Sequence, residues 1–152
     1  RSGGILQVVS TTKTDTFATT STTDVDVTGL SATITPRSTS SKILVLVSAP
    51  FSTTTNQINS ITLTRGGTPI GGGTIVGSRT SAFKSAYLTS VNTGGMLSGE
   101  HLDSPSTTSS ITYQVQAKTS AGTMTIGISG GDSNAANHPR TSSTITLMEV
   151  AG

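Results

Sequence analysis

Few side chains in this sequence could carry out catalysis or bind a metal ion. There are two histidines and no cysteine, so thiol catalysis, disulfides and thiolate metal sites are excluded. His101 and Asp103 are two residues apart, and on a strand they would lie on one face, as two metal ligands or as a base with its orienting acid. No second cluster of ligands accompanies them, and the favoured interpretation is a strand end that leads into a turn at Asp103.

Nucleophiles and paired acids give no stronger signal for an enzyme. Serine is abundant, but no Gly-x-Ser-x-Gly elbow occurs. Asp24 and Asp26 alternate with Val25 and Val27, which places both acids on the solvent face of a strand. The glycine runs at 66–67 and 71–73 open no helix, so they lack the context of a phosphate-binding loop. We expect no enzymatic activity, no catalytic residue, no metal and no cofactor.

A long polar segment, residues 129–142, is the best candidate for recognition. It combines hydrogen-bond donors, acceptors and charges of both signs, and polar loops on rigid sandwiches often bind partners. The alternative is a solvated connection between strands. The candidate recognition residues are Asp132, Asn134, Asn137, His138 and Arg140.

The composition favours a single domain with a neutral surface. The chain has 152 residues, and Ser and Thr make up more than a third of it, whereas only 11% of the residues are charged. Threonine is β-branched and favours strands. Nine basic residues are scattered singly against seven acidic ones, without the basic cluster or aromatic platform that nucleic-acid binding requires.

The most apolar strand of the chain is expected at residues 41–50, and the other strands are expected to be arranged around it. Its five consecutive apolar residues, 43–47, are far too few to span a bilayer, which takes about 20 in a helix. Side chains alternate along a strand, so Ile43, Val45 and Val47 should face the core while Leu44 and Leu46 face the other way. Pro50 is expected to end the strand.

The other predicted elements are also strands, because no segment shows the apolar spacing of a helix. Gly29 should produce a bulge, Gly66-Gly67 a hairpin, residues 51–59 a polar turn region, and residues 86–91 should pair with 96–102. Other predicted strands are 5–9, 24–28, 31–35, 61–65, 68–70, 74–76, 111–118, 123–128 and 143–150. The predicted fold is all-β, an antiparallel two-sheet β-sandwich of the jelly-roll type, over residues 5–152, with 1–4 as a linker from an upstream segment.

Several segments together resemble a family of virion proteins of tailed bacteriophages, common in marine phages. In that family, such a domain ends tail fibres or other surface fibres. The resemblance lies in residues 4–17, 25–30, 34–36, 40–45, 63–68, 102–105, 112–116 and 143–150.

The resemblance implies a jelly-roll head like the trimeric heads of complement and tumour-necrosis-factor proteins, located on the virion surface and joined to an upstream stem. Its partners would be two further copies of the chain, other virion proteins and a glycan or protein of the host surface, with neither nucleic acid nor membrane insertion. In such a trimer, Leu44 or Leu46 would lie near a subunit contact. The alternative is a purely structural capsid decoration protein or self-assembling filament subunit.

Overall fold

The computed structural model describes residues 3–152, and within this range its secondary structure consists of strands and no helix. None of its segments is therefore a helix of the length and apolar character needed to cross a membrane. The strands are β1 (Ile5–Lys13), β2 (Phe17–Thr19), β3 (Val25–Ile34), β4 (Lys42–Thr53), β5 (Gln57–Arg65), β6 (Thr68–Ile70), β7 (Lys84–Leu88), β8 (Thr93–Asp103), β9 (Ile111–Thr119), β10 (Met124–Ile126) and β11 (Ser143–Val150).

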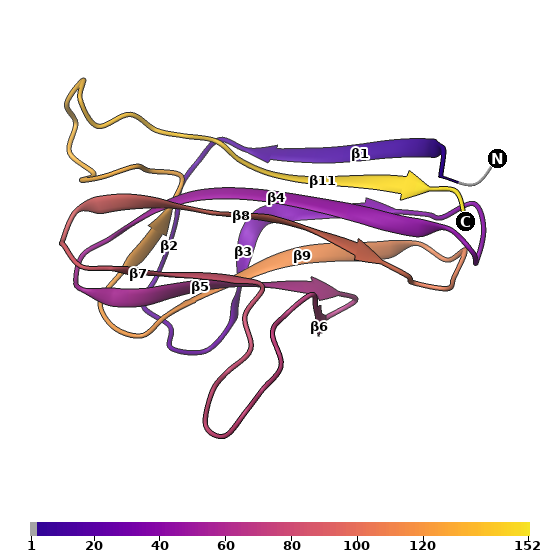
Figure 1. Cartoon of the computed structure of the whole chain (residues 1–152). Helices are drawn as coiled ribbons and strands as arrows, with labels where there is room; N and C mark the ends of the chain where they lie inside the picture. Colours follow the sequence, from indigo (N-terminus) through magenta and orange to yellow (C-terminus); the bar gives the residue numbers. More distant parts are fainter. Residues whose placement is uncertain (1–2) are drawn as a thin grey trace.

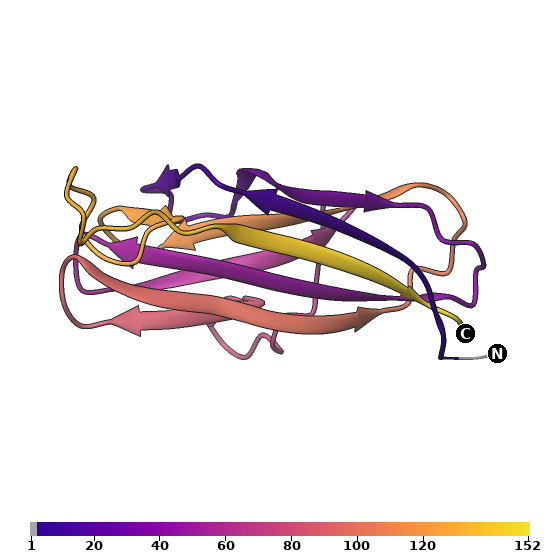
Figure 2. The ribbon, with the colours of Figure 1, turned by 90° about the horizontal axis from the view of Figure 1, so that it is seen from above.

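The strands form two antiparallel sheets that lie face to face (Figures 1 and 2). In the first sheet β4 is central, with β8 along one edge and β11 and then β10 along the other; β1 lies outside β11, and β2 outside β10. In the second sheet β5 and β9 are central, with β3 outside β9, and with β7 and β6 along the free edge of β5.

Successive long strands alternate between the sheets, which is the pattern of a jelly roll. The chain runs from β3 in the second sheet to β4 in the first, back to β5 and β7, across to β8, back to β9 and finally across to β11. This confirms the predicted antiparallel two-sheet sandwich of the jelly-roll type.

The core lies between the sheets and is built on the alternation of β4. Ile43, Val45 and Val47 are buried, as predicted, and belong to one cluster with Leu63 of β5 and Val115 of β9. Complete burial of such a side chain contributes about 1.5–3 kcal/mol. The core therefore closes within one copy of the chain, without the outward residues of β4.

The proline in β4 does not end the strand, contrary to prediction. β4 continues to Thr53, and the Pro50 carbonyl oxygen accepts a hydrogen bond of 2.8 Å from the N–H of Gly127. Because the N and O of a strand residue point to the same edge, the Pro50 nitrogen faces the junction where pairing with β11 has ended at Ser48 and pairing with β10 begins at Phe51. Its missing N–H therefore removes no ladder hydrogen bond.

Three other local predictions are wrong. Residues 51–59 belong mostly to β4 and β5, with Phe51 fully buried, and residues 74–76 lie in a loop. The segments 86–91 and 96–102 do not pair, because β7 joins β5 in one sheet and β8 joins β4 in the other. Turn residues such as Asn92 serve a hairpin and a sheet-to-sheet connection equally well, so the local pattern did not separate them.

Two glycine predictions are confirmed. Gly66 and Gly67 have φ values of 55° and 84° and connect β5 to β6 in a hairpin. Gly29, with φ at 83°, lies within the register shift between β3 and β9. Both places require the left-handed backbone that glycine adopts without strain.

The two ends of the described chain lie side by side, at the end of the sandwich opposite the 129–142 loop (Figure 1). The N–H of Gly3 donates to the carbonyl of Ala151, and the N–H of Ala151 donates to that of Gly4, both at 2.8 Å. Arg1 and Ser2, half of the predicted linker, lie outside the described residues.

Candidate functional site

The predicted recognition loop, residues 129–142, projects from the end of the sandwich away from the termini (Figure 1). Asp132, Asn134, His138 and Arg140 line one hollow of about 330 Å³, whereas Asn137 does not line it. Arg140 Nη2 lies 2.8 Å from Asp132 Oδ1, and both of these side chains are exposed. The structure thus brings four of the five predicted residues together.

Asp132, Arg140 and His138 of this loop already have partners within the loop. Ser133 approaches His138 twice, with its N–H donating to Nδ1 at 3.2 Å and its Oγ 2.5 Å from the same nitrogen. The Asp132–Arg140 ion pair is exposed, and such pairs contribute at most about 1 kcal/mol. A partner could therefore replace these contacts at small cost, which suits a recognition surface better than a catalytic one.

Two bridges and a glycine fix the base of the loop. Gly130 pairs with Thr93 of β8, and Ile128 pairs with Arg140 across the loop. The backbone of Ser129 passes so close to Gly94 that a Cβ on Gly94 would lie 2.4 Å from the Ser129 oxygen. Only glycine leaves room for this approach.

His101 and Asp103 point inward between the sheets, and Asp103 has a structural role. Arg65 of β5 donates to both of its carboxylate oxygens, at 2.8 and 3.0 Å, and the Tyr113 hydroxyl of β9 donates to Oδ2 at 2.6 Å. Burial and this hydrogen bond raise the pKa of Tyr113. In residues 3–152, no three His, Asp or Glu side chains come together as a metal site.

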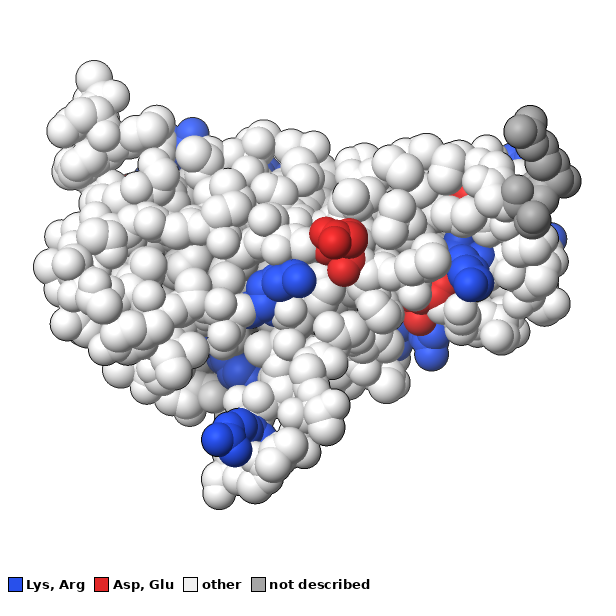
Figure 3. Space-filling model, in the orientation of Figure 1, with Lys and Arg blue, Asp and Glu red and all other residues white. Residues whose placement is uncertain are grey.

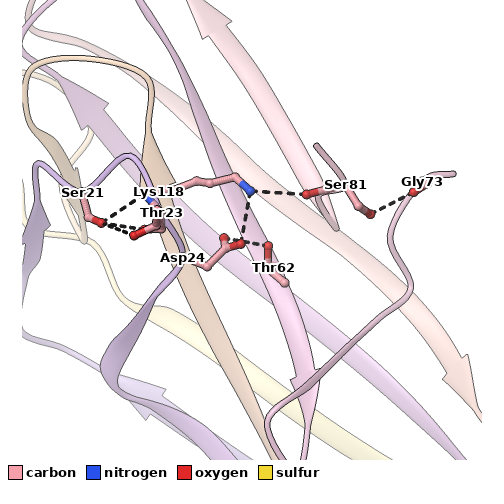
Figure 4. A network of polar contacts seen from close by, with 7 residues as sticks. All are labelled: Ser21, Thr23, Asp24, Thr62, Gly73, Ser81 and Lys118. Carbon is pink, nitrogen blue, oxygen red and sulfur yellow. Dashed lines mark hydrogen bonds and ion pairs between the residues drawn. The ribbon is translucent and has the colours of Figure 1, made fainter. Parts of the chain in front are cut away.

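A second hollow, which the sequence did not reveal, lies on the outer face of the second sheet. Its volume is about 360 Å³. Asp24, the residue before β3, accepts hydrogen bonds from Thr62 of β5 at 2.9 Å and from Lys118 of β9 at 3.2 Å. Figure 4 shows these three side chains meeting, with Ser81 on the other side of the Lys118 nitrogen; the Ser81 carbonyl oxygen also accepts from Lys118, at 3.4 Å.

The opposite wall of this hollow is the loop 71–83 between β6 and β7, which projects from the sandwich (Figure 1). Two hydrogen bonds join the two arms of the loop. The Ser81 hydroxyl donates to the Gly73 carbonyl at 2.9 Å, and the Gly73 N–H donates to the Ala82 carbonyl at 3.4 Å. Ile75 and Arg79 of the loop line the hollow. Arg79 is the one basic residue of this loop, and Figure 3 shows a basic patch on the projecting loop, apart from the acidic patches of the same face.

Sequence reasoning missed this hollow because its walls come from four distant segments. Asp24, Thr62 and Lys118 each look like ordinary outward residues of alternating strands. The one local signal was the 71–83 loop, in which apolar Ile75 and Val76 precede Arg79 between glycine-rich stretches and both apolar residues are exposed.

The outer face of the first sheet carries several exposed apolar side chains. One row across four strands contains Val8, Met148, Leu44 and Leu102, which are paired in register. Leu46 lies in the next row and is 37% exposed. Both predicted contact residues therefore point away from the core, as the alternation of β4 requires.

Comparison with known proteins gives only remote similarity. No family model matches the chain, and no curated protein matches it. Two solved structures overlap 96% of the chain with 16% sequence identity: infectious bursal disease virus strain Gx, at a TM-score of 0.43, and T=1 particles derived from infectious bursal virus, at 0.44. This chain spans 37% and 36% of those two chains.

Proposed function

We propose that this chain is a non-enzymatic domain of a virion surface, a fibre tip or head fibre, that assembles as a homotrimer and binds the host surface. The observation that carries the proposal is the apolar outer face of the first sheet. The sequence resemblance to phage fibre heads supplies the virion context and the number of subunits.

The occupant proposed for this face is another copy of the chain. Exposed Val8 and Leu102 lie at the two ends of the apolar row that contains Met148 and Leu44, and exposed apolar surface of this kind commonly marks a protein contact. The paired positions across β4 include Lys42, opposite Val150, and Glu100, opposite Leu46. Charges of opposite sign on one face allow identical copies to complement each other.

The ends of the molecule suit a fibre head. The termini lie at one end of the sandwich and the 129–142 loop at the other (Figures 1 and 2). A stem that joined at the terminal end would direct this loop outward. Three loops in one trimer would turn weak contacts into strong attachment, because linked contacts bind at a high effective concentration.

Sedimentation equilibrium and binding of labelled protein to host cells test the two parts of the proposal separately. We expect a single species of three times the chain mass, 15.3 kDa. We also expect the double variant Asn134→Ala, Asn137→Ala to bind cells less than the matched variant Thr108→Ala at the opposite end. A monodisperse monomer would contradict the trimer, and equal attachment by both variants would contradict recognition by the loop.

The second candidate is a structural capsid decoration protein or filament subunit. It is favoured by the ion pair and the His138 contacts within the loop, which leave the loop complete without a receptor. A trimer that binds isolated capsids or filaments but shows no attachment to host cells would select this alternative.

A further inference from the structure

We propose that the hollow between β5, β9 and the 71–83 loop binds an acidic saccharide, a sugar whose carboxylate is held by Arg79. This assigns a ligand class to a surface separate from the 129–142 loop. Its biological meaning rests on the host-surface role proposed above, although binding itself does not require that role.

The charge of the lining residues favours an anion. Asp24 and Lys118 form an ion pair of 3.2 Å and largely balance each other. Arg79 also lines the hollow, and in the described part of the chain it has no carboxylate within ion-pair distance. Its Nη1 donates to the Val76 carbonyl at 3.2 Å. Because a guanidinium has five N–H donors in a planar fork, Arg79 can still bind a carboxylate through two hydrogen bonds.

The remaining lining residues favour a sugar over a simple anion. Asp24 can accept further hydrogen bonds from ligand hydroxyls, and Thr80 lines the hollow from the opposite wall as a donor or acceptor. Ile70 and Ile75 supply an apolar wall for the C–H groups of a sugar ring. The volume, about 360 Å³, falls within the range of about 300–1,000 Å³ that is usual for small-ligand pockets.

A smaller hollow of about 160 Å³ adjoins the hollow that contains Arg79 and shares Thr80 and Lys118 with it. Its other walls include the hydroxyls of Thr22, Ser60 and Ser120. This arrangement suits a neutral sugar unit linked to the acidic one. Both hollows lie on the outer face of the second sheet, so they stay open when the outer face of the first sheet is covered by neighbouring copies.

Saturation-transfer NMR with the whole chain tests the proposal. We expect methyl β-D-glucuronide to bind saturably in the millimolar range, and methyl β-D-glucoside to bind at least about tenfold more weakly, a difference of about 1.4 kcal/mol. The exposed Arg79→Gln should weaken glucuronide binding by about tenfold and leave glucoside binding unchanged. The matched Arg37→Gln, at an exposed arginine that lines neither hollow, should leave both unchanged.

Three results would overturn the inference: no glucuronide binding, equal glucuronide binding by Arg79→Gln and the unaltered chain, or displacement of glucuronide by an equal concentration of acetate. The readout observes the ligand and works at any protein size, so it is independent of assembly. A trimer that fails to bind sugar would overturn only this inference, whereas a sugar-binding monomer would overturn only the proposed trimer.

Discussion

The hydroxyl of Tyr113 donates a hydrogen bond of 2.6 Å to the carboxylate of Asp103, and this contact joins the two sheets through the core. Tyr113 belongs to β9 in the second sheet and Asp103 ends β8 in the first. Asp103 also receives both hydrogen bonds from Arg65. A carboxylate that the sequence offered as a possible ligand therefore holds the sandwich together.

Removing this hydroxyl should destabilise the fold. In Tyr113→Phe the buried Asp103 carboxylate loses one donor while the ring still packs, so we expect a loss of about 1–3 kcal/mol. Urea unfolding monitored by circular dichroism measures it. Tyr87→Phe, at an exposed tyrosine on β7, is the control and should leave the midpoint unchanged; equal midpoints for the two variants would contradict the structural role.

Stability should fall in acid partly through Glu149. Burial raises the pKa of this carboxyl, but hydrogen bonds from the Gln7 side chain, at 2.6 Å, and from the Arg37 N–H, at 2.7 Å, help to hold the pKa below its ordinary value. A lowered pKa stabilises the fold above the ordinary value, and this contribution disappears as the pH falls through the folded value.

Thermal unfolding from about pH 7 to pH 3 tests this expectation. Glu149→Gln should be less stable than the unaltered chain at neutral pH, and the difference should shrink in acid. The exposed Glu100→Gln serves as the control. A difference that stays constant with pH would show that the Glu149 charge does not contribute.

A charge beside the apolar row of the first sheet should prevent assembly. Leu46→Lys places an ammonium opposite Glu100 on β8, so the strand pair remains compatible within one copy while the proposed contact between copies gains a buried charge. We expect a folded monomer in sedimentation. Tyr87→Lys, on the second sheet, should stay trimeric, and a trimeric Leu46→Lys would place the contact elsewhere.

The recognition loop should depend on Gly94. In Gly94→Ala the new methyl group would meet the Ser129 backbone, which must move, at a cost of about 1–3 kcal/mol. Amide hydrogen exchange should increase in residues 129–142 and not in β11. The control is Gly73→Ala, because Gly73 has open space around its missing Cβ; unchanged exchange in the loop would show that Gly94 does not fix its base.

The elements that could be predicted are those whose pattern is local. The strict alternation of β9 and β11 and the inward face of β4 follow from a period of two, and the Gly66-Gly67 hairpin follows from turn chemistry. Pairing between distant segments is not local. The sequence therefore did not show that β7 and β8 belong to different sheets, nor that pairing passes from β11 to β10 beside Pro50.

The candidate sites divide in the same way. The 129–142 loop is continuous, so its polar residues could be found by composition alone. The hollow beside Lys118 brings together Asp24, Thr62 and Arg79 from three other segments, and nothing in their local sequence distinguishes them from solvated side chains. The inward position of Asp103 was also visible only after pairing with Ile43 was known.

The backbone hydrogen bonds of Gly3 and Gly4 with Ala151 hold the two ends of the described chain next to each other. Since both ends leave from neighbouring positions, the sandwich could be grafted into a surface turn of another protein and replace only a short connection, with the 129–142 loop still facing outward. For the same reason, the ends could be joined and the chain reopened at residues 104–110, giving a circularly permuted form with the same two sheets.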